Sequence, residues 1–351
     1  MIQERILKIS GIHLGEQMSK KLTVIVPSYN SQNTIIKCLD SLFHQTYTSF
    51  DVYVIDDGST DSTRNMVQKY IESKKNFYLF FKKNGGPGSA RNYGLNITKT
   101  SYVTFVDSDD FVSYDHLENM MIQFKRHSQA DMSICGYYII NENGDIKNRA
   151  GIKKGILNSE EAISKVFISN SIGCYSVNKI YRMSIIRKNK ICFPEDIYVS
   201  EDTIFVVTYL LNCHEIIVSN NHTYCYVHHK ATLSELLAVS SEFDKRGLTV
   251  FLSYDRVLKI LPHSYKRAIT YASAYKAWEA IHVIRHIYYL KVVKDNKSIL
   301  SQMVDIASKN KYIFYKTSSF SLKQKVIFFL VLHAPKLFNY IFDFLKRKWE
   351  N

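Results

Sequence analysis

Two acidic residues separated by one residue, Asp107 and Asp109, are the first candidates for chemistry in this sequence of 351 residues. They directly follow an apolar, β-rich run at residues 102–106. Two carboxylates at a strand end can bind a hard divalent cation that keeps several waters and also contacts phosphate groups. Such a cation would stabilise the negative charge that a nucleoside diphosphate gains as it leaves. The pattern D-x-D is also common in solvated turns, so on its own it leaves both interpretations open.

Two further segments carry groups suited to a nucleotide. Asp57 follows an apolar run at residues 51–55, where its carboxylate can accept the ring N–H of a uracil, and Gly58 allows a tight turn. Residues 84–92 (NGGPGSARN) are glycine-rich but lack the spacing of a P-loop or a dinucleotide fingerprint. Arg91, near a helix start, suits the nucleotide or its phosphates. Capped strand-to-helix turns would explain both segments without any function.

A second acidic pair, Glu201 and Asp202, begins a helical run after a break at Pro194. A hydroxyl that attacks a sugar carbon needs a general base to accept its proton, and a carboxylate at a helix start fits that role. The helix dipole favours acidic residues at the same position, so an ordinary helix start remains the alternative.

Short strands alternating with helices must position these side chains. Strands are expected near residues 22–27, 51–55, 77–81, 102–106 and 132–140, with helical spacing of apolar residues between them and a hairpin turn at 141–145. This order predicts an α/β fold with right-handed crossovers and a mostly parallel sheet. Ligands bind at the carboxyl ends of such strands, so the polar clusters at 28–30, 56–57, 84–86 and 107–109 should converge on one edge.

The chain changes character near residue 241. Residues 241–351 hold 20 Lys/Arg and 8 Asp/Glu, a net charge of +12, against +2 for residues 1–240. Their periodicity is helical, with a stripe that we interpret as core: Tyr271, Tyr275, Trp278, Ile281, Ile284 and Tyr288. Residues 321–348 mix aromatic and aliphatic side chains with lysines, which favours a helix lying on an anionic membrane. A helix packed on the protein, with solvated lysines, is the alternative.

Composition narrows the class of protein. With 46% hydrophobic and 22% charged residues the chain is an ordinary globular protein. Its six scattered cysteines lack metal-ligand spacing and predict free thiols in a reducing cytoplasm. Residues 1–10 contain Glu4, Arg5 and Lys8 and no apolar signal segment, and the longest apolar run, residues 326–332, is far short of a membrane span of about 20 residues. We therefore expect a cytoplasmic protein, peripheral on the inner face of the membrane.

Taken in order, six segments resemble the family 2 glycosyltransferases: VIVPSYN (24–30), VIDDGSTD (54–61), NGGPGSARNYGL (84–95), YVTFVDSDDF (102–111), NKIYR (178–182) and EDTIF (201–205). That family is inverting, has a GT-A fold and is common in bacterial capsule, lipopolysaccharide and wall-polymer synthesis. The resemblance implies a GT-A, Rossmann-like, mostly parallel sheet flanked by helices and followed by a helical, basic C-terminal region. The implied division is an extension (1–20), a catalytic domain (21–240, with a nucleotide half at about 21–112 and an acceptor half at about 113–240) and the C-terminal region (241–351).

The resemblance also implies roles on the donor side. Pro27, Tyr29 and Asp57 would line the uridine pocket, with Asp57 holding the uracil ring and Arg91 supporting it. Asp107 would face the ribose and the sugar and contribute to the metal site.

On the cation and acceptor side, the resemblance makes Asp109 the main cation ligand and Asp202 the catalytic base, with Glu201 as its neighbour. Lys179 would contact substrate. In the segment YVHHK (226–230), His229 would reach the cation or the diphosphate; a surface histidine pair is the alternative.

Two positions depart from the family pattern. Val177 stands where family members often have a Trp, and Val227 where many have an Arg. Both positions belong to the acceptor or diphosphate side, so the resemblance leaves the identity of the acceptor open.

The predicted reaction is an inverting transfer of a hexosyl or N-acetylhexosaminyl group from a UDP-sugar to a hydroxyl of a glycan or lipid-linked acceptor, with Mn²⁺ or Mg²⁺ as cofactor. A nucleotidyltransferase is one alternative, but the first strand-to-helix turn reads Ser28-Tyr29-Asn30 and lacks a glycine-rich signature with Lys or Arg. A non-enzymatic basic protein that binds membrane or polyanion is another; it would leave the ordered carboxylates without a role. We expect no nucleic-acid partner.

Overall fold

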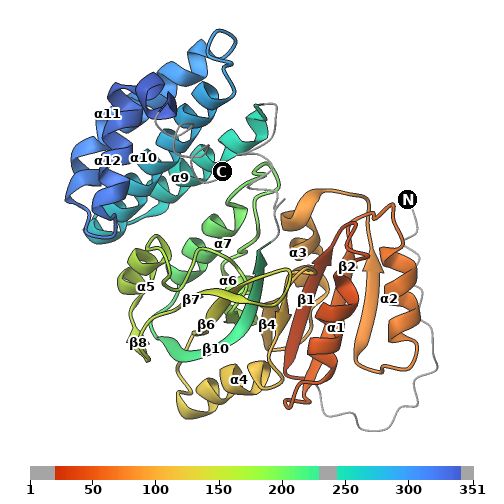
Figure 1. The fold of residues 1–351 in the computed structure, drawn as a ribbon. Coiled ribbons are helices and arrows are strands. Elements are labelled where there is room, and N and C mark those ends of the chain that lie inside the picture. Colours follow the sequence, from red (N-terminus) through yellow and green to blue (C-terminus); the bar gives the residue numbers. More distant parts are fainter. Residues whose placement is uncertain (1–19, 229–242, 341–351) are drawn as a thin grey trace.

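The computed structural model describes residues 20–228 and 243–340 (Figure 1). Its first half alternates strands and helices: β1 (Leu22–Ser28), α1 (Ile35–Phe43), β2 (Phe50–Asp56), α2 (Thr63–Ile71), β3 (Phe77–Phe81), α3 (Gly86–Ile97) and β4 (Tyr102–Phe105). Every residue of β1 is buried, as expected for a parallel strand covered on both faces. The expected strands and helices are confirmed, except that α3 begins at Gly86 and not near Ser89.

The strand order β3-β2-β1-β4 explains where ligands can bind. All three pairings in this series are parallel. The chain runs outward from β1 to β3 and then returns past β1 to β4. Right-handed crossovers therefore place α3 on the face opposite α1 and α2. The direction reverses between β1 and β4, which is the switch point where open α/β sheets bind ligands.

The second half extends the sheet: β5 (Phe111–Val112), α4 (His116–Arg126), β6 (Met132–Asn141), β7 (Ile146–Ala150), β8 (Gly155–Leu157), α5 (Ser159–Val166), β9 (Lys179–Arg182), α6 (Met183–Lys188), α7 (Glu201–Leu210) and β10 (Ile216–His228). Strand β9 lies between β4 and β6 and is antiparallel to both, whereas β10 is parallel to β6. The expected hairpin turn at 141–145 joins β6 to β7. The sheet is thus parallel around the nucleotide half and mixed beyond β4, within an α/β fold.

Helices follow the sheet: η1 (Lys245–Leu248), α9 (Thr249–Ile260), α10 (Lys266–Tyr289), α11 (Lys297–Lys316) and α12 (Leu322–His333). Figure 1 shows them gathered beside α5 and α7, and α9 packs on α7 while α10 packs on α5. The predicted core stripe of α10 is confirmed, because Ile281 and Ile284 are buried and Trp278 stacks on Phe314. Across the described residues, no helix is both long and apolar enough to span a bilayer.

The helix predicted near the C-terminal end is divided in two, and the cysteines are unpaired with one another. The expected helix over residues 321–348 is interrupted at Ala334, because Pro335 has no N–H to continue the hydrogen-bond ladder; helix resumes at 335–340, and the rest lies outside the described residues. All six cysteines are free thiols, as predicted.

Candidate active site

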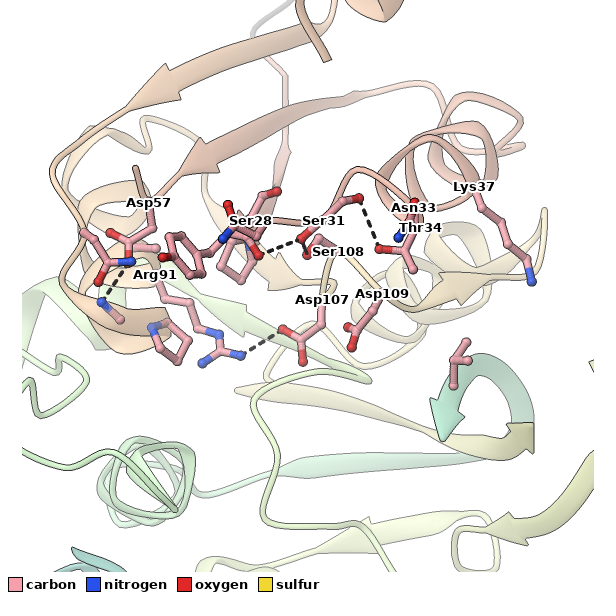
Figure 2. Close-up of a pocket in the computed structure, with 18 of the residues that line it drawn as sticks. Ser28, Ser31, Asn33, Thr34, Lys37, Asp57, Arg91, Asp107, Ser108 and Asp109 are labelled. Carbon is pink, nitrogen blue, oxygen red and sulfur yellow. Dashed lines mark hydrogen bonds and ion pairs between the residues drawn. The ribbon is translucent and has the colours of Figure 1, made fainter. Parts of the chain in front are cut away.

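A pocket of about 820 Å³ opens at the carboxyl ends of the parallel strands (Figure 2). The segments that follow β1, β2, β3 and β4 all contribute to it, so the predicted convergence of polar clusters on one edge is confirmed. Its lining includes the predicted residues Pro27, Tyr29, Asp57, Arg91, Asp107 and Asp109. Lys37, Glu142 and Val227 line it as well. No sequence pattern singles out Lys37 or Glu142, since they come from a helix face and a hairpin turn.

Asp57 is held at the start of α3. Its carboxylate accepts hydrogen bonds from the backbone N–H groups of Gly86 (2.7 Å) and Gly85 (3.1 Å). Lys82 donates a third bond of 2.7 Å from its ammonium group. Gly86 has a φ of +87°, which a side chain would strain, and this turn directs both N–H groups at one carboxylate. Lys82 was missed by sequence reasoning, although its place directly after a predicted strand, two residues before the glycine-rich loop, was a usable signal.

The loop after β1 is tied to the loop after β2. Asn30 donates from its backbone N–H to Ser59 Oγ (3.0 Å) and accepts from Thr60 N (2.8 Å) through its side chain. Asn30 adopts a positive φ of 49°, which asparagine tolerates better than most residues. These bonds fix the pocket wall that carries Pro27 and the half-exposed Tyr29.

The acidic loop after β4 is anchored by its last residue. Asp110 is buried and accepts hydrogen bonds from Tyr224 Oη (2.5 Å) and Val227 N (2.8 Å). Burial, and then the charges of Asp109 and Asp107, raise the pKa of Asp110 well above its usual range. Asp110 therefore serves as the anchor, and Asp107 and Asp109 are the two carboxylates of this loop that line the pocket (Figure 2).

Arg91 joins this loop to the second acidic pair. It is 4% exposed, and its guanidinium lies 2.8 Å from Asp107 Oδ1, 3.0 Å from Glu201 Oε1 and 3.3 Å from Asp202 Oδ1. Three carboxylates from two distant segments thus share one buried cation. The predicted contact of Arg91 with uridine stays a prediction, because in this structure its hydrogen bonds go to carboxylates.

Burial shifts the titration of the acidic pair. It raises the pKa of Glu201 to about 7, with a further increase from Asp202 and a decrease from Arg91. Burial also raises the pKa of Asp202, against the opposing charge of Arg91. A base whose pKa approaches the working pH is better matched to proton transfer than a solvated carboxylate.

The segment before the acidic pair is held by the helical region. Ser200 has a φ of +69°, a strained value for a serine. Its carbonyl accepts a 2.8 Å hydrogen bond from Ser253 Oγ of α9, and Thr249 Oγ1 accepts from the N–H groups of Tyr198 and Val199. Helix α9 therefore fixes the backbone that presents Glu201 and Asp202.

Lys179 does not line the pocket. Its side chain is 0% exposed, and its ammonium donates to the carbonyls of Ile172 and Tyr175 (both 2.8 Å) and to Asn178 Oδ1 (2.9 Å). These bonds use the cation to shape the loop before β9. The predicted substrate contact of Lys179 therefore has no support in this structure, because the group that would make the contact is buried and fully bonded.

In the part of the chain that the structure describes, the carboxylate pair Asp107 and Asp109 could supply metal ligands. His229 lies outside the described residues, so its predicted contact with the cation or diphosphate stays a prediction. Within 20–228 and 243–340, no group of three or more His, Cys, Asp or Glu side chains is placed to hold a metal ion. Asp107 and Asp109 would need donors from the substrate and from water to complete a coordination shell.

Comparison with known proteins identifies the family. The family model described as Glycosyl transferase family 2 matches residues 23–189. The chain is 30% identical over 213 residues to the poly(ribitol-phosphate) beta-glucosyltransferase of Bacillus spizizenii, covering 59% of this chain and 32% of that protein. It is 29% identical over 283 residues to the poly(ribitol-phosphate) beta-N-acetylglucosaminyltransferase TarP of Staphylococcus aureus, covering 78% and 80%.

Solved structures agree on the fold. The crystal structure of S. aureus TarS 1–349 in complex with UDP-GlcNAc superimposes with a TM-score of 0.55 at 21% identity, over 84% of this chain and 90% of that one. The chain spans about a third of the length of the Bacillus spizizenii enzyme and of full-length TarS (32% and 35%). The family model, the named relatives and the shared fold agree, and residues 23–189 of this chain form a family 2 glycosyltransferase domain.

Proposed function

We propose that this protein transfers a hexosyl or N-acetylhexosaminyl group from a UDP-sugar to a hydroxyl of a glycan or lipid-linked acceptor in the synthesis of a bacterial surface polymer. One observation carries the proposal: a single pocket joins Asp57, the Asp107–Asp109 loop and, through Arg91, the acidic pair Glu201 and Asp202. That arrangement offers a nucleotide subsite, carboxylates for the diphosphate end and a base in one place. TarS and the glucosyltransferase relatives carry out, by their names, reactions of this class.

The chain's own groups can perform an in-line displacement. Asp57, fixed by Gly85, Gly86 and Lys82, accepts the ring N–H of uracil and sets the position of the nucleotide. Asp202 accepts the proton of the acceptor hydroxyl as that oxygen attacks the anomeric carbon. The attack from the face opposite the leaving diphosphate inverts the configuration, so an α-linked donor gives a β-linked product. Arg91 holds Asp202 in register with Asp107.

The acidic loop fits a divalent cation, Mn²⁺ or Mg²⁺. Asp107 and Asp109 supply oxygen donors, the type that hard cations prefer. They stand next to a third carboxylate, Asp110, whose pKa is raised by burial and then by their charges. A cation held by this pair would offset that excess of negative charge and would stabilise the departing diphosphate when bound. His229 is the third candidate ligand on sequence grounds.

The test is release of UDP from a panel of UDP-sugars in the presence of Mn²⁺. We expect one donor to be hydrolysed slowly by the wild type, and the rate to be lost in Asp109→Ala and Asp202→Asn. Asp305→Asn, on the exposed surface of α11, serves as the control and should keep the wild-type rate. No turnover of any UDP-sugar, or equal rates in the wild type and Asp109→Ala, would contradict the proposal.

We further propose that the C-terminal helices bring the enzyme to the inner face of the cell membrane, where lipid-linked acceptors are found. Beside exposed lysines, large apolar side chains point to solvent on α12 and the helix after it: Leu322, Val326, Phe329, Leu337 and Tyr340. Apolar side chains among lysines bind anionic bilayers. Co-sedimentation should show binding to vesicles with phosphatidylglycerol and not to pure phosphatidylcholine, and the double change Leu322→Gln/Phe329→Gln should weaken it. Equal binding to both vesicles would reject this placement.

The alternatives have less support. A nucleotidyltransferase and a non-enzymatic basic binder are not favoured by the family match or by the named relatives. The binder would also leave unexplained why Asp57, Arg91 and Asp107 are held at one pocket by specific hydrogen bonds.

A further inference from the structure

An aromatic cluster lies beside the proposed base and outside the residues that line the donor pocket. Tyr175 belongs to the loop before β9 and remains 42% exposed although its ring stacks on Tyr226 of β10, with centroids 6.0 Å apart and ring planes at 14°. Tyr137 of β6 meets the edge of the same ring at 6.3 Å and 89°. We call these three rings the Tyr175 platform. A partly exposed aromatic ring that is held in place by stacking offers a flat apolar surface to a ligand.

The platform faces the reaction site. Side chains two residues apart on a strand point to the same side, about 7 Å apart along it, so Tyr226 and Tyr224 share one face of β10. The hydroxyl of Tyr224 lies 3.3 Å from Asp107 N and binds Asp110. The platform residue Tyr226 therefore lies two residues along β10 from the tyrosine that contacts the acidic loop.

The other side of the platform borders the proposed base. Ser176 follows Tyr175 directly in the chain. The pKa of Asp202 is raised by burial, lowered by the Arg91 charge and lowered further, by a smaller amount, through polar contacts from Ser176. Conversely, the Asp202 charge, after the larger effects of Cys174 and burial, helps to raise the pKa of the Tyr175 hydroxyl. Tyr175 and Ser176 are thus near Asp202, and the platform is near the acidic loop through Tyr224 of the same strand face.

The loop that carries Tyr175 is built to stay in one conformation. The buried ammonium of Lys179 binds the carbonyls of Ile172 and Tyr175, which close the loop around it. Gly173 has a φ of +72°, and a Cβ there would lie 3.1 Å from the Tyr175 ring. A buried lysine, a left-handed glycine and a ring stack together fix the ring before any ligand arrives, which lowers the entropy cost of binding.

The chemistry of the platform selects an uncharged ring. Its surface consists of π faces and phenol hydroxyls, and Lys179, the cation beneath it, is fully buried and committed to carbonyls. One face of a pyranose is lined by C–H groups and packs on an aromatic ring, while its hydroxyls remain free for hydrogen bonds. A chain of alditol phosphates offers no such face and would need cations.

We propose that the Tyr175 platform is the acceptor subsite and binds a pyranose unit of the acceptor glycan, with the attacking hydroxyl directed to Asp202. This inference rests on the proposed function for the identity of the bound sugar as acceptor. It assigns to this chain a cyclic sugar acceptor, whereas the relatives compared above are named for poly(ribitol-phosphate).

The test is saturation-transfer NMR with the full chain, UDP and Mg²⁺. The probes are the methyl β-pyranosides of glucose, galactose and N-acetylglucosamine, with ribitol 5-phosphate as the competing class. We expect at least one pyranoside to bind and its C–H protons to receive saturation. Tyr175→Ala should weaken that binding by about tenfold and Tyr175→Phe should retain it. Tyr312→Ala, which removes a tyrosine of α11 that is 65% exposed, should leave it unchanged.

Two results would overturn the subsite: no pyranoside binds, or binding of any probe is the same in Tyr175→Ala as in the wild type. UDP release from the donor without acceptor is measured in parallel in the wild type and in Tyr312→Ala, and the two rates should be equal, because Tyr312 lies on α11 and does not line the donor pocket. Pyranoside binding that depends on Tyr175 in a protein that never releases UDP would reject the proposed transferase function and keep the sugar site. UDP release by a protein whose pyranoside binding is the same in Tyr175→Ala as in the wild type would reject the sugar site and keep the proposed transferase function.

Discussion

Replacing Arg91 by methionine removes the one cation shared by the acidic loop and the proposed base. The side chain is 4% exposed and makes charge-assisted hydrogen bonds of 3.0 Å to Glu201 and 2.8 Å to Asp107. Methionine has a similar length, so the main loss is the charge and not the packing. Removing one partner of a buried ion pair costs about 3–5 kcal/mol, because the remaining charge stays buried and unpaired. We expect Arg91→Met to lower the free energy of unfolding by about that amount at pH 8.

The cost should depend on pH with a definite sign. Burial holds the pKa of Glu201 at about 7, above its ordinary value of 4.5, and the Arg91 charge is what limits this increase. A carboxyl whose folded pKa is raised contributes stability that is present below its unfolded pKa and is lost as pH rises through the folded pKa. Without Arg91 the folded pKa values of Glu201 and Asp202 rise further, so the destabilisation should be smaller at pH 5.5 than at pH 8.

Urea unfolding of both proteins at the two pH values measures this effect. Lys309→Met is the matched control, because its partner Asp305 is at 2.7 Å but the two side chains are 73% and 56% exposed; we expect a change below about 0.5 kcal/mol. The double variant Arg91→Met/Glu201→Gln should be more stable than additivity predicts, by about 1 kcal/mol or more, since it leaves one buried charge fewer. Equal losses in Arg91→Met and Lys309→Met, or a larger loss at pH 5.5 than at pH 8, would refute the reasoning.

Three further predictions concern the pocket and its support. Asp57→Asn removes a charged acceptor of the uracil N–H and should weaken UDP binding about tenfold or more, measured by calorimetry. Asp109→Asn should abolish the response of UDP release to added Mn²⁺. Asp110→Asn should keep the response, because both carboxylate oxygens of Asp110 already accept hydrogen bonds from β10. Loss of the response in both variants would show that Asp110 belongs to the metal site. Ser253→Ala removes the hydrogen bond to the Ser200 carbonyl, worth about 1 kcal/mol, and should lower kcat about fivefold with the donor KM unchanged; an unchanged kcat would show that α9 does not position the base.

The donor side of the pocket was predictable from sequence because its signals are local. Each strand end carries its own polar cluster, and the strand order places these ends together whatever the details of packing. Asp57, Asp107 and Asp109 therefore line the pocket at the strand ends where the alternation of strands and helices predicts them. Family resemblance added the uridine and cation roles, which spacing alone leaves open.

The acceptor side depends on contacts between segments far apart in the chain, and sequence patterns do not encode these. Lys179 is an example: its motif suggests substrate binding, but its buried ammonium donates hydrogen bonds to carbonyls of the preceding loop. The stack of Tyr175 on Tyr226 could not be predicted from the sequence either, because Tyr175 lies before the short strand β9 and Tyr226 lies near the end of the long strand β10.

The support of the base by α9 also changes the meaning of the sequence boundary near residue 240. Composition and periodicity change there, which suggests a separate C-terminal unit, yet Ser253 and Thr249 bind the backbone of residues 198–200. Ser200 keeps a left-handed conformation without being a glycine, and strain of this kind persists only when the surroundings hold it. The helices of the region that carries most of the net positive charge therefore also hold the backbone before the acidic pair, so a protein cut at residue 240 should retain the donor pocket and lose the geometry of Asp202.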